Sequence, residues 1–190
     1  MALFLILAPY GAFATLMLLT SAAASLFASA AICLAAMAYD IARGRSIKML
    51  GAGSAMVFAA LGGYVTLVDP GWSTSAVKLA VDTGVLAISL ASLLIRRPFT
   101  LQYAREMVDA ETVALPGFMR VNYILSGAWT LAFLLMVLAN VLLIYVPGLP
   151  LWSGIVIAFA ARNTALYFTK WYPEYRRAKY PASAASASTL

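Results

Sequence analysis

Long runs of nearly uncharged hydrophobic residues, separated by short basic stretches, dominate this sequence of 190 residues. Eleven of the thirteen Lys and Arg residues lie in three clusters between or after these runs. The clusters are Arg43, Arg45 and Lys48; Arg96, Arg97, Arg105 and Arg120; and Lys170, Arg176, Arg177 and Lys179. Basic residues concentrated beside hydrophobic spans are typical of the cytoplasmic loops of proteins that thread a bilayer. The pattern predicts an all-α, polytopic membrane protein.

The composition agrees with this class. Hydrophobic residues make up 64% of the chain and charged residues 11%, whereas a soluble domain carries about 25% charged residues. We expect one transmembrane domain over residues 1–180 and a disordered, Ala/Ser-rich tail over residues 181–190. The net charge of +6 lies at the membrane edges, which indicates anionic lipid at the cytoplasmic face, and no nucleic acid, as the neighbour.

The hydrophobic runs predict about six transmembrane helices arranged as three hairpins. The first 39 residues are apolar throughout, which is too long for one helix and fits two, with the turn at Thr20 and Ser21. Asp69-Pro70-Gly71 and Pro147-Gly148 are strong turn signals that end two further helices. The six expected helices span about 3–19, 22–39, 49–68, 76–95, 120–146 and 151–170.

The arrangement of the basic clusters predicts the orientation. Six helices place all three clusters and both termini on one side of the membrane, which is therefore expected to be cytoplasmic. The turns on the other side contain no Lys or Arg. In an alternative with five helices, residues 1–39 hold one helix and one re-entrant segment, and the N-terminus lies outside.

The connection from Phe99 to Gly117 is the longest polar segment between the hydrophobic runs. Apolar residues recur there at three- and four-residue spacing, including Phe99, Tyr103 and Met107. The spacing predicts a short amphipathic helix on the cytoplasmic interface, with these three side chains docking a partner or the membrane. An ordinary structured loop is the alternative.

Asp82 lies inside a predicted helix, about 9 Å below its outer end. An ionised Asp in that position costs about 2.5–3.5 kcal/mol on insertion scales, which the surrounding Val, Leu and Ile residues offset. Lys78 lies one turn above, so a structural ion pair with Asp82 is the preferred interpretation. A proton or ion site at Asp82 is the alternative.

Arg162, which Asn163 follows, lies about 16 Å below the outer start of the last helix. A charge at this depth needs a partner or water inside the bundle. Our hypothesis is that Asp82, Asn140 and Arg162 form one polar cluster. Snorkelling of Arg162 to the cytoplasmic face is the competing interpretation.

The sequence carries few residues that serve catalysis. It has no histidine, and its single cysteine, Cys33, lies among Ala, Ile and Leu residues that indicate a buried small hydrophobe. It shows no P-loop, no metal-ligand cluster and no nucleophile–base arrangement. We therefore expect no catalytic residues, metal site or cofactor, and favour a protein that is not an enzyme.

Several short sequence features follow one another between Lys48 and Trp129. They are Gly62-Gly63 with Thr66-Leu67, Lys78, Arg96-Arg97-Pro98-Phe99, Leu115-Pro116, Asn122 and Trp129. In order and spacing this stretch resembles the bacterial intracellular septation protein A family, also called the inner membrane protein YciB family. The resemblance implies a multi-pass protein of the bacterial inner membrane, linked to envelope maintenance and septation and acting with division and elongation proteins. It implies no catalytic residues.

Three functions follow from these observations. The first is a non-enzymatic inner-membrane protein that supports envelope synthesis or septation through helix–helix contacts and the 99–117 segment. The second is a small transporter or ion conduit, with Asp82 and Arg162 lining the path. The third is a lipid-modifying membrane enzyme. The identity of the partners and homo-oligomerisation stay open.

Overall fold

The computed structural model describes residues 2–146 and 148–179, and this part of the chain is all-helical, which confirms the predicted α class. The expected tail over residues 181–190 lies outside the described residues. The eight helices are α1 (Ala2–Leu19), α2 (Ala22–Ala42), α3 (Met49–Leu67), α4 (Thr74–Leu94), α5 (Phe99–Ala104), α6 (Ala110–Ala114), α7 (Phe118–Tyr145) and α8 (Leu151–Lys179). The six long helices match the predicted ranges to within a few residues, except that α8 continues to Lys179.

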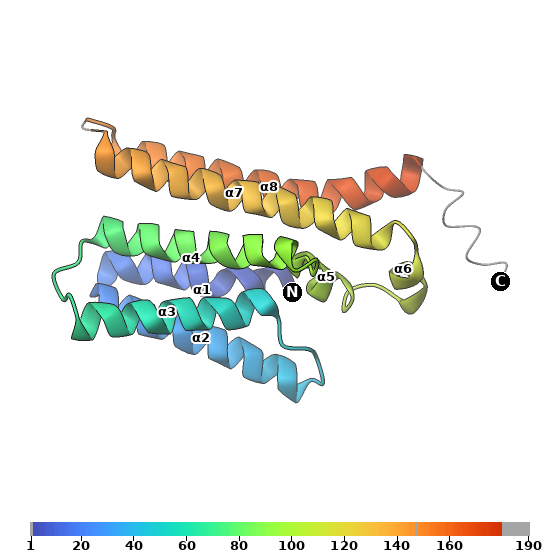
Figure 1. The fold of residues 1–190 in the computed structure, drawn as a ribbon, viewed down its shortest axis with the longest axis horizontal. Coiled ribbons are helices and arrows are strands. Elements are labelled where there is room, and N and C mark those ends of the chain that lie inside the picture. The colour runs from blue at the N-terminus through green and yellow to red at the C-terminus, as the bar shows by residue number, and fades with distance from the viewer. Residues whose placement is uncertain (1, 147, 180–190) are drawn as a thin grey trace.

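The long helices pack as sequential antiparallel hairpins (Figure 1). Helices α1 to α4 form one group, and α7 pairs with α8 in a second layer that joins the first through α4 and α7. Four helices, α2, α3, α4 and α7, are long and apolar enough to cross a membrane. The chain is therefore consistent with a helical membrane protein, in which α1 and α8 pack beside these four helices.

Local sequence explains where several helices begin and end. Ser21 and Ser73 are the N-caps of α2 and α4, and each side chain accepts a hydrogen bond from the backbone N–H three residues on. At the other end of α4, Arg96 has φ 57°, and Arg97 N–H donates to the Ser92 carbonyl (2.9 Å). This left-handed residue reverses the chain before Pro98.

Close contact between α3 and α4 depends on glycine. A Cβ built on Gly53 would lie 2.7 Å from Cδ1 of Ile88, and one on Gly84 would lie 2.7 Å from Cγ1 of Val57. Each glycine thus receives a branched side chain of the opposite helix, as expected where small residues let helices approach closely in lipid.

The core forms two hydrophobic clusters. Phe13, Leu26 and Phe58 belong to the first, between α1, α2 and α3, with Val77 and Val81 from α4. The second joins the rest of the molecule to α7 and α8, and its members are Leu50, Val85, Phe99, Trp129, Ala132, Ala161 and Ala165. Through Phe99, this second cluster holds α5 against α7.

The 99–117 segment differs from the single amphipathic helix that the spacing predicts. It forms two short helices, α5 and α6, because Asp109 caps α6 and residues 105–109 are not helical. Phe99 is only 3% exposed and Tyr103 packs against the second core cluster, whereas Met107 is 64% exposed. The apolar face of α5 therefore points into the bundle, and of the three predicted docking residues only Met107 lies on the surface.

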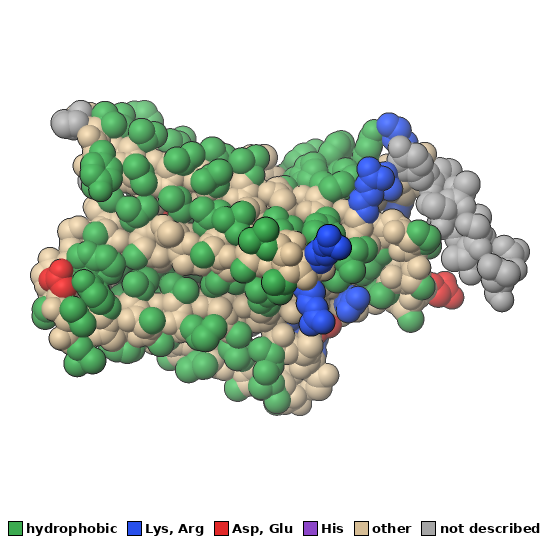
Figure 2. All heavy atoms as spheres, viewed as in Figure 1, with side chains coloured by type: hydrophobic (Ala, Val, Ile, Leu, Met, Phe, Trp, Pro, Cys, Tyr) green, Lys and Arg blue, Asp and Glu red, His purple; other side chains and the backbone are tan. Residues whose placement is uncertain are grey.

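The side chains of Lys and Arg gather toward the end of the bundle where α5 and α6 lie (Figure 2). Helix α1 begins and α8 ends toward this same end (Figure 1). The basic clusters of the sequence thus come together in space, and we refer to this part of the molecule as the basic end.

Candidate functional site

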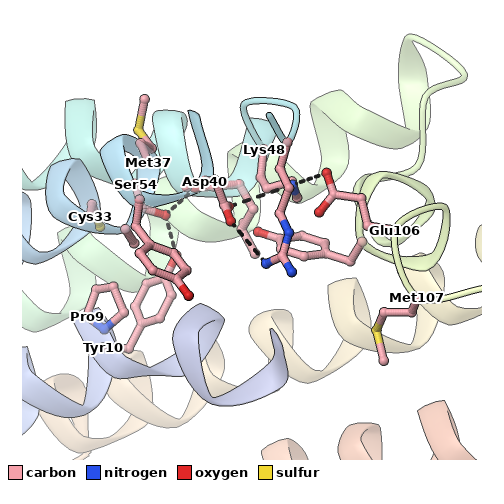
Figure 3. A pocket seen from close by; sticks show the side chains of 15 residues that line it. Pro9, Tyr10, Cys33, Met37, Asp40, Lys48, Ser54, Glu106 and Met107 are labelled. Carbon is pink, nitrogen blue, oxygen red and sulfur yellow. Dashed lines mark hydrogen bonds and ion pairs between the residues drawn. The ribbon is translucent and has the colours of Figure 1, made fainter. Parts of the chain in front are cut away.

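A cavity of about 190 Å³ lies at the basic end, between α1, α2, α3 and the end of α5 with the residues that follow it (Figure 3). A buried water needs roughly 10–15 Å³ of such volume, so the space holds on the order of ten waters or a small solute. Charged side chains lie at one end of the cavity, which we call its mouth, and aromatic and small side chains lie at the other end, which we call its floor (Figure 3). They include Tyr10, Cys33, Asp40, Arg45, Lys48, Ser54, Tyr103 and Glu106.

Lys48 is the centre of the polar mouth, although it is only 5% exposed. Its Nζ lies 2.5 Å from Oε1 of Glu106 and 3.7 Å from Oδ2 of Asp40, and it donates to the Ser46 carbonyl (2.8 Å). A buried ammonium is stable where such acceptors replace water. Lys48 therefore ties together the end of α2, the start of α3 and the segment after α5.

Besides its contact with Lys48, Glu106 binds Ser46 in the α2–α3 connection. Its Oε1 accepts hydrogen bonds from the backbone N–H (3.2 Å) and the hydroxyl (3.1 Å) of Ser46. Partial burial acts to raise the pKa of Glu106, but the hydrogen bonds from Lys48 and Ser46 outweigh it and lower that pKa below its usual value. The Lys48–Glu106 contact is thus an ion pair at neutral pH.

Two aromatic residues and two small polar residues form the floor of the cavity. The hydroxyl groups of Tyr10 and Ser54 are hydrogen-bonded to each other, and Ser54 Oγ also contacts the Leu50 carbonyl (2.6 Å). Cys33 is buried beside them, as the sequence predicts. Burial raises the pKa of Tyr103, which is consequently a neutral phenol at the edge of the ion-pair network.

The predicted intramembrane cluster assembles only in part. Asn140 Nδ2 on α7 donates a hydrogen bond to Asp82 Oδ2 on α4, so these two residues do meet across a helix–helix seam. Among the described residues, every ion pair involves Asp40 or Lys48. Within this part of the chain Lys78 and Asp82 therefore make no ion-pair contact of 4.0 Å or less, although Lys78 is near enough to attract the carboxylate.

Arg162 does not join Asp82 and Asn140. It is half-buried on α8, which packs mainly against α7, and it forms no ion pair within the described ranges. Asn163 donates to the Phe159 carbonyl of its own helix (2.7 Å). Helix α7 lies between α4 and α8 in the packing order, which keeps Arg162 from Asp82.

No periodic sequence pattern indicates the residues at the mouth of the cavity. In the sequence Lys48 marks topology as part of a basic cluster, and nothing in that pattern predicts a role for Asp40 or Glu106. One feature of the sequence does indicate this site: Asp40 and Lys48 carry opposite charges on either side of Gly44. Gly44 has φ 68° and reverses the chain between them. The contribution of Glu106 depends on tertiary structure alone.

The cavity offers hydrogen-bond donors, acceptors and paired charges, which suit the binding of a small polar group. Across residues 2–146 and 148–179, no group of three or more Cys, Asp and Glu side chains is placed to hold a metal ion. Comparisons with protein-family models, with curated proteins and with solved structures found no match to this chain.

Proposed function

We propose that this protein is a non-enzymatic, multi-pass protein of the bacterial inner membrane that supports envelope synthesis or septation through protein–protein contacts. Four helices with the length and composition of membrane spans support the membrane part of this proposal. The resemblance of the 48–129 stretch supports the role in septation. In this account α1 and α8 also cross the membrane, and the basic end with both termini is cytoplasmic.

The Asp82–Asn140 hydrogen bond is the observation that carries the proposal. A transport path requires polar groups that face water, whereas Asp82 bonds to Asn140 across the α4–α7 seam. Neither Asp82 nor Arg162 lines the cavity at the basic end. Polar groups that join helices in this way favour a bundle that acts through its outer surface.

The outer surface of α8 is the strongest candidate for such contacts. Large hydrophobic side chains along this helix are exposed, among them Ile155, Val156, Phe159, Tyr167 and Trp171. Helix α8 is bound to the rest of the molecule mainly through α7, which leaves this face to lipid or to a partner helix. A partner membrane protein would bury it by helix–helix packing.

Photo-crosslinking in living cells tests this function. A photoreactive phenylalanine analogue replaces Phe159 on α8, and a matched variant carries it at Leu18, an exposed position on α1. We expect specific crosslinks from position 159 to division or elongation proteins, and altered cell length when the gene is deleted. Equal crosslinking from both positions together with unchanged cell length would contradict the proposal.

A small transporter or ion conduit is the second candidate, for which the sequence suggests Asp82 and Arg162 as residues lining the path. The observation in its favour is the cavity that leads from the basic end to the Tyr10–Ser54 pair inside the bundle. Flux of protons or small ions in proteoliposomes, lost in Asp82→Asn, would support it. Identical ion permeability in protein-containing and empty liposomes would exclude it.

A further inference from the structure

A second cavity at the basic end, of about 200 Å³, lies between α6, the start of α7 and the end of α8. Its walls are mainly apolar, and two guanidinium groups of α8 complete its lining. The principal lining residues are Val108, Leu115, Phe118, Val121, Leu125, Pro173, Arg176 and Arg177. A space with apolar walls and cationic side chains suits an anionic amphiphile.

Asn122 lines this cavity and the smaller one of about 100 Å³ beside it, and it is only 1% exposed. Its Nδ2 donates to the Phe118 carbonyl (2.9 Å), which fixes the orientation of the amide because a carbonyl needs a donor. Its Oδ1 is the buried side-chain polar atom, among the described residues, that has no hydrogen-bond partner. Buried polar atoms are nearly always paired, so this acceptor lacks a donor. Because the oxygen has almost no accessible surface, a donor from the cavity reaches it when the side chains that cover it shift.

Positive charge gathers at the start of α7. Gly117 is the N-cap of this helix and provides no side-chain cap. A Cβ built on Gly117 would lie 3.7 Å from Nη2 of Arg176, so the guanidinium lies beside the helix N-terminus. Arg177 attracts the exposed Asp109 carboxylate, which itself accepts a hydrogen bond from the Thr112 amide (2.7 Å). Two guanidinium groups and the N-terminus of α7 thus lie together at this end of the cavity.

The spacing of these groups limits the ligand. Asn122 follows Gly117 by five residues, which places it about 7.5 Å further along the helix axis. A ligand that spans this distance presents its anion to Arg176 and Arg177 and a hydroxyl to Asn122, with an alkyl chain along the apolar walls. The glycerol hydroxyl of a monoacyl phospholipid lies beside its phosphate, whereas in a diacyl phospholipid that oxygen is esterified and donates no hydrogen bond.

We propose that this cavity binds an anionic lysophospholipid from the bilayer. The phosphate contacts Arg176, Arg177 and the first turn of α7, the free glycerol hydroxyl donates to Asn122 Oδ1, and the acyl chain lies against the apolar walls. A soluble glycerol phosphate shares the anion and the hydroxyl, but it leaves the apolar walls uncovered. The bilayer is therefore the source to which the geometry points.

Binding to the purified full-length protein in detergent, measured by native mass spectrometry, tests the ligand. The probes are lysophosphatidylglycerol, its 2-deoxy analogue, lysophosphatidylcholine and glycerol 3-phosphate. We expect lysophosphatidylglycerol to bind at least tenfold more tightly than each of the other three. Equal binding of the 2-deoxy analogue would overturn the role of Asn122, equal binding of lysophosphatidylcholine the role of the cations, and equal binding of glycerol 3-phosphate the lipid source.

Variants test the residues in the same assay. Asn122→Leu is expected to weaken lysophosphatidylglycerol about tenfold and to leave the 2-deoxy analogue unchanged. Asn163→Leu is the matched control, because Asn163 makes the same bond to the carbonyl four residues back but is exposed. The double variant Arg176→Gln with Arg177→Gln should lose the preference for the anionic lipid, whereas Arg96→Gln with Arg97→Gln should keep it. Equal losses in target and control variants would overturn the site.

Discussion

Lys48 Nζ and Glu106 Oε1 lie 2.5 Å apart although 58 positions separate the two residues in the chain. This contact joins the α2–α3 connection to the segment that follows α5, and both side chains line the first cavity. Because Asp40 binds the same ammonium, the three residues act as one unit. Their coupling leads to the first two predictions.

Replacing Lys48 by Met should destabilise the protein by about 1.5–3 kcal/mol, because the hydrogen bonds of the buried ammonium are lost while the two carboxylates it leaves stay accessible to water. Glu106→Gln keeps an acceptor for Ser46 and should cost less, about 1–2 kcal/mol. The free energy of unfolding in a denaturing-detergent titration measures both effects. Arg43→Gln serves as the control at an exposed position of the same loop, and an equal loss there would show that the ion pair is unimportant.

The Lys48–Glu106 pair should make stability depend on pH in the acidic range. The folded pKa of Glu106 lies below the ordinary value of 4.5, so the pair stabilises the fold above that value. Stability is then lost as the pH falls from 4.5 through the lower folded pKa, since Glu106 becomes protonated. Thermal unfolding of wild type and Glu106→Gln between pH 7 and 3 tests the effect, and the variant should show the shallower decline. Parallel curves would contradict it.

Asp82 should be coupled energetically to Asn140 and not to Arg162. Asn140→Leu removes the donor that satisfies the Asp82 carboxylate and should cost about 1–3 kcal/mol. In double-mutant cycles, Asp82→Asn and Arg162→Gln should be additive within about 0.5 kcal/mol, whereas Asp82→Asn and Asn140→Leu should not. A large coupling between Asp82 and Arg162 would restore the three-residue cluster that the sequence suggests.

Gly84→Ala should destabilise the α3–α4 contact by about 1–3 kcal/mol, because the new methyl group meets Val57, whose branched side chain has little freedom. Gly63→Ala, at a position with open space around it, should be neutral or slightly stabilising. Adding Val57→Ala should rescue the first variant. Thermal unfolding in a mild detergent measures all three, and equal effects of the two glycine changes would contradict the close packing.

Much of the fold could be predicted from the sequence, because hydrophobic length and turn residues determine membrane-length helices almost independently of tertiary contacts. The turns at Ser21 and at Asp69-Pro70-Gly71 are local features, and the helices follow them. The sequence pattern indicates the apolar face of α5 but not the side to which that face points. That orientation depends on α7, where Ser126 and the Asn122 carbonyl bind Thr100.

The candidate sites were less predictable for the same reason. The Asp82–Asn140 bond could be anticipated from depth in two neighbouring helices, since polar groups at equal depth tend to meet. Lys48 and Glu106 carry no such periodic signal, because one belongs to a loop and the other to the irregular segment 105–109. The unpaired Asn122 oxygen could not be predicted either, because in the sequence Asn122 is only one polar residue of a hydrophobic helix.

The central claim is that the bundle crosses the membrane with its basic end in the cytoplasm, and single-cysteine labelling tests it most directly. In a Cys33→Ala background, a membrane-impermeant maleimide is applied to intact and to permeabilised cells carrying one cysteine each at position 20, 71, 47 or 107. We predict labelling of Thr20→Cys and Gly71→Cys in intact cells, and of Ile47→Cys and Met107→Cys only after permeabilisation. Labelling of Ile47→Cys or Met107→Cys in intact cells, or protection of Thr20→Cys, would contradict the account.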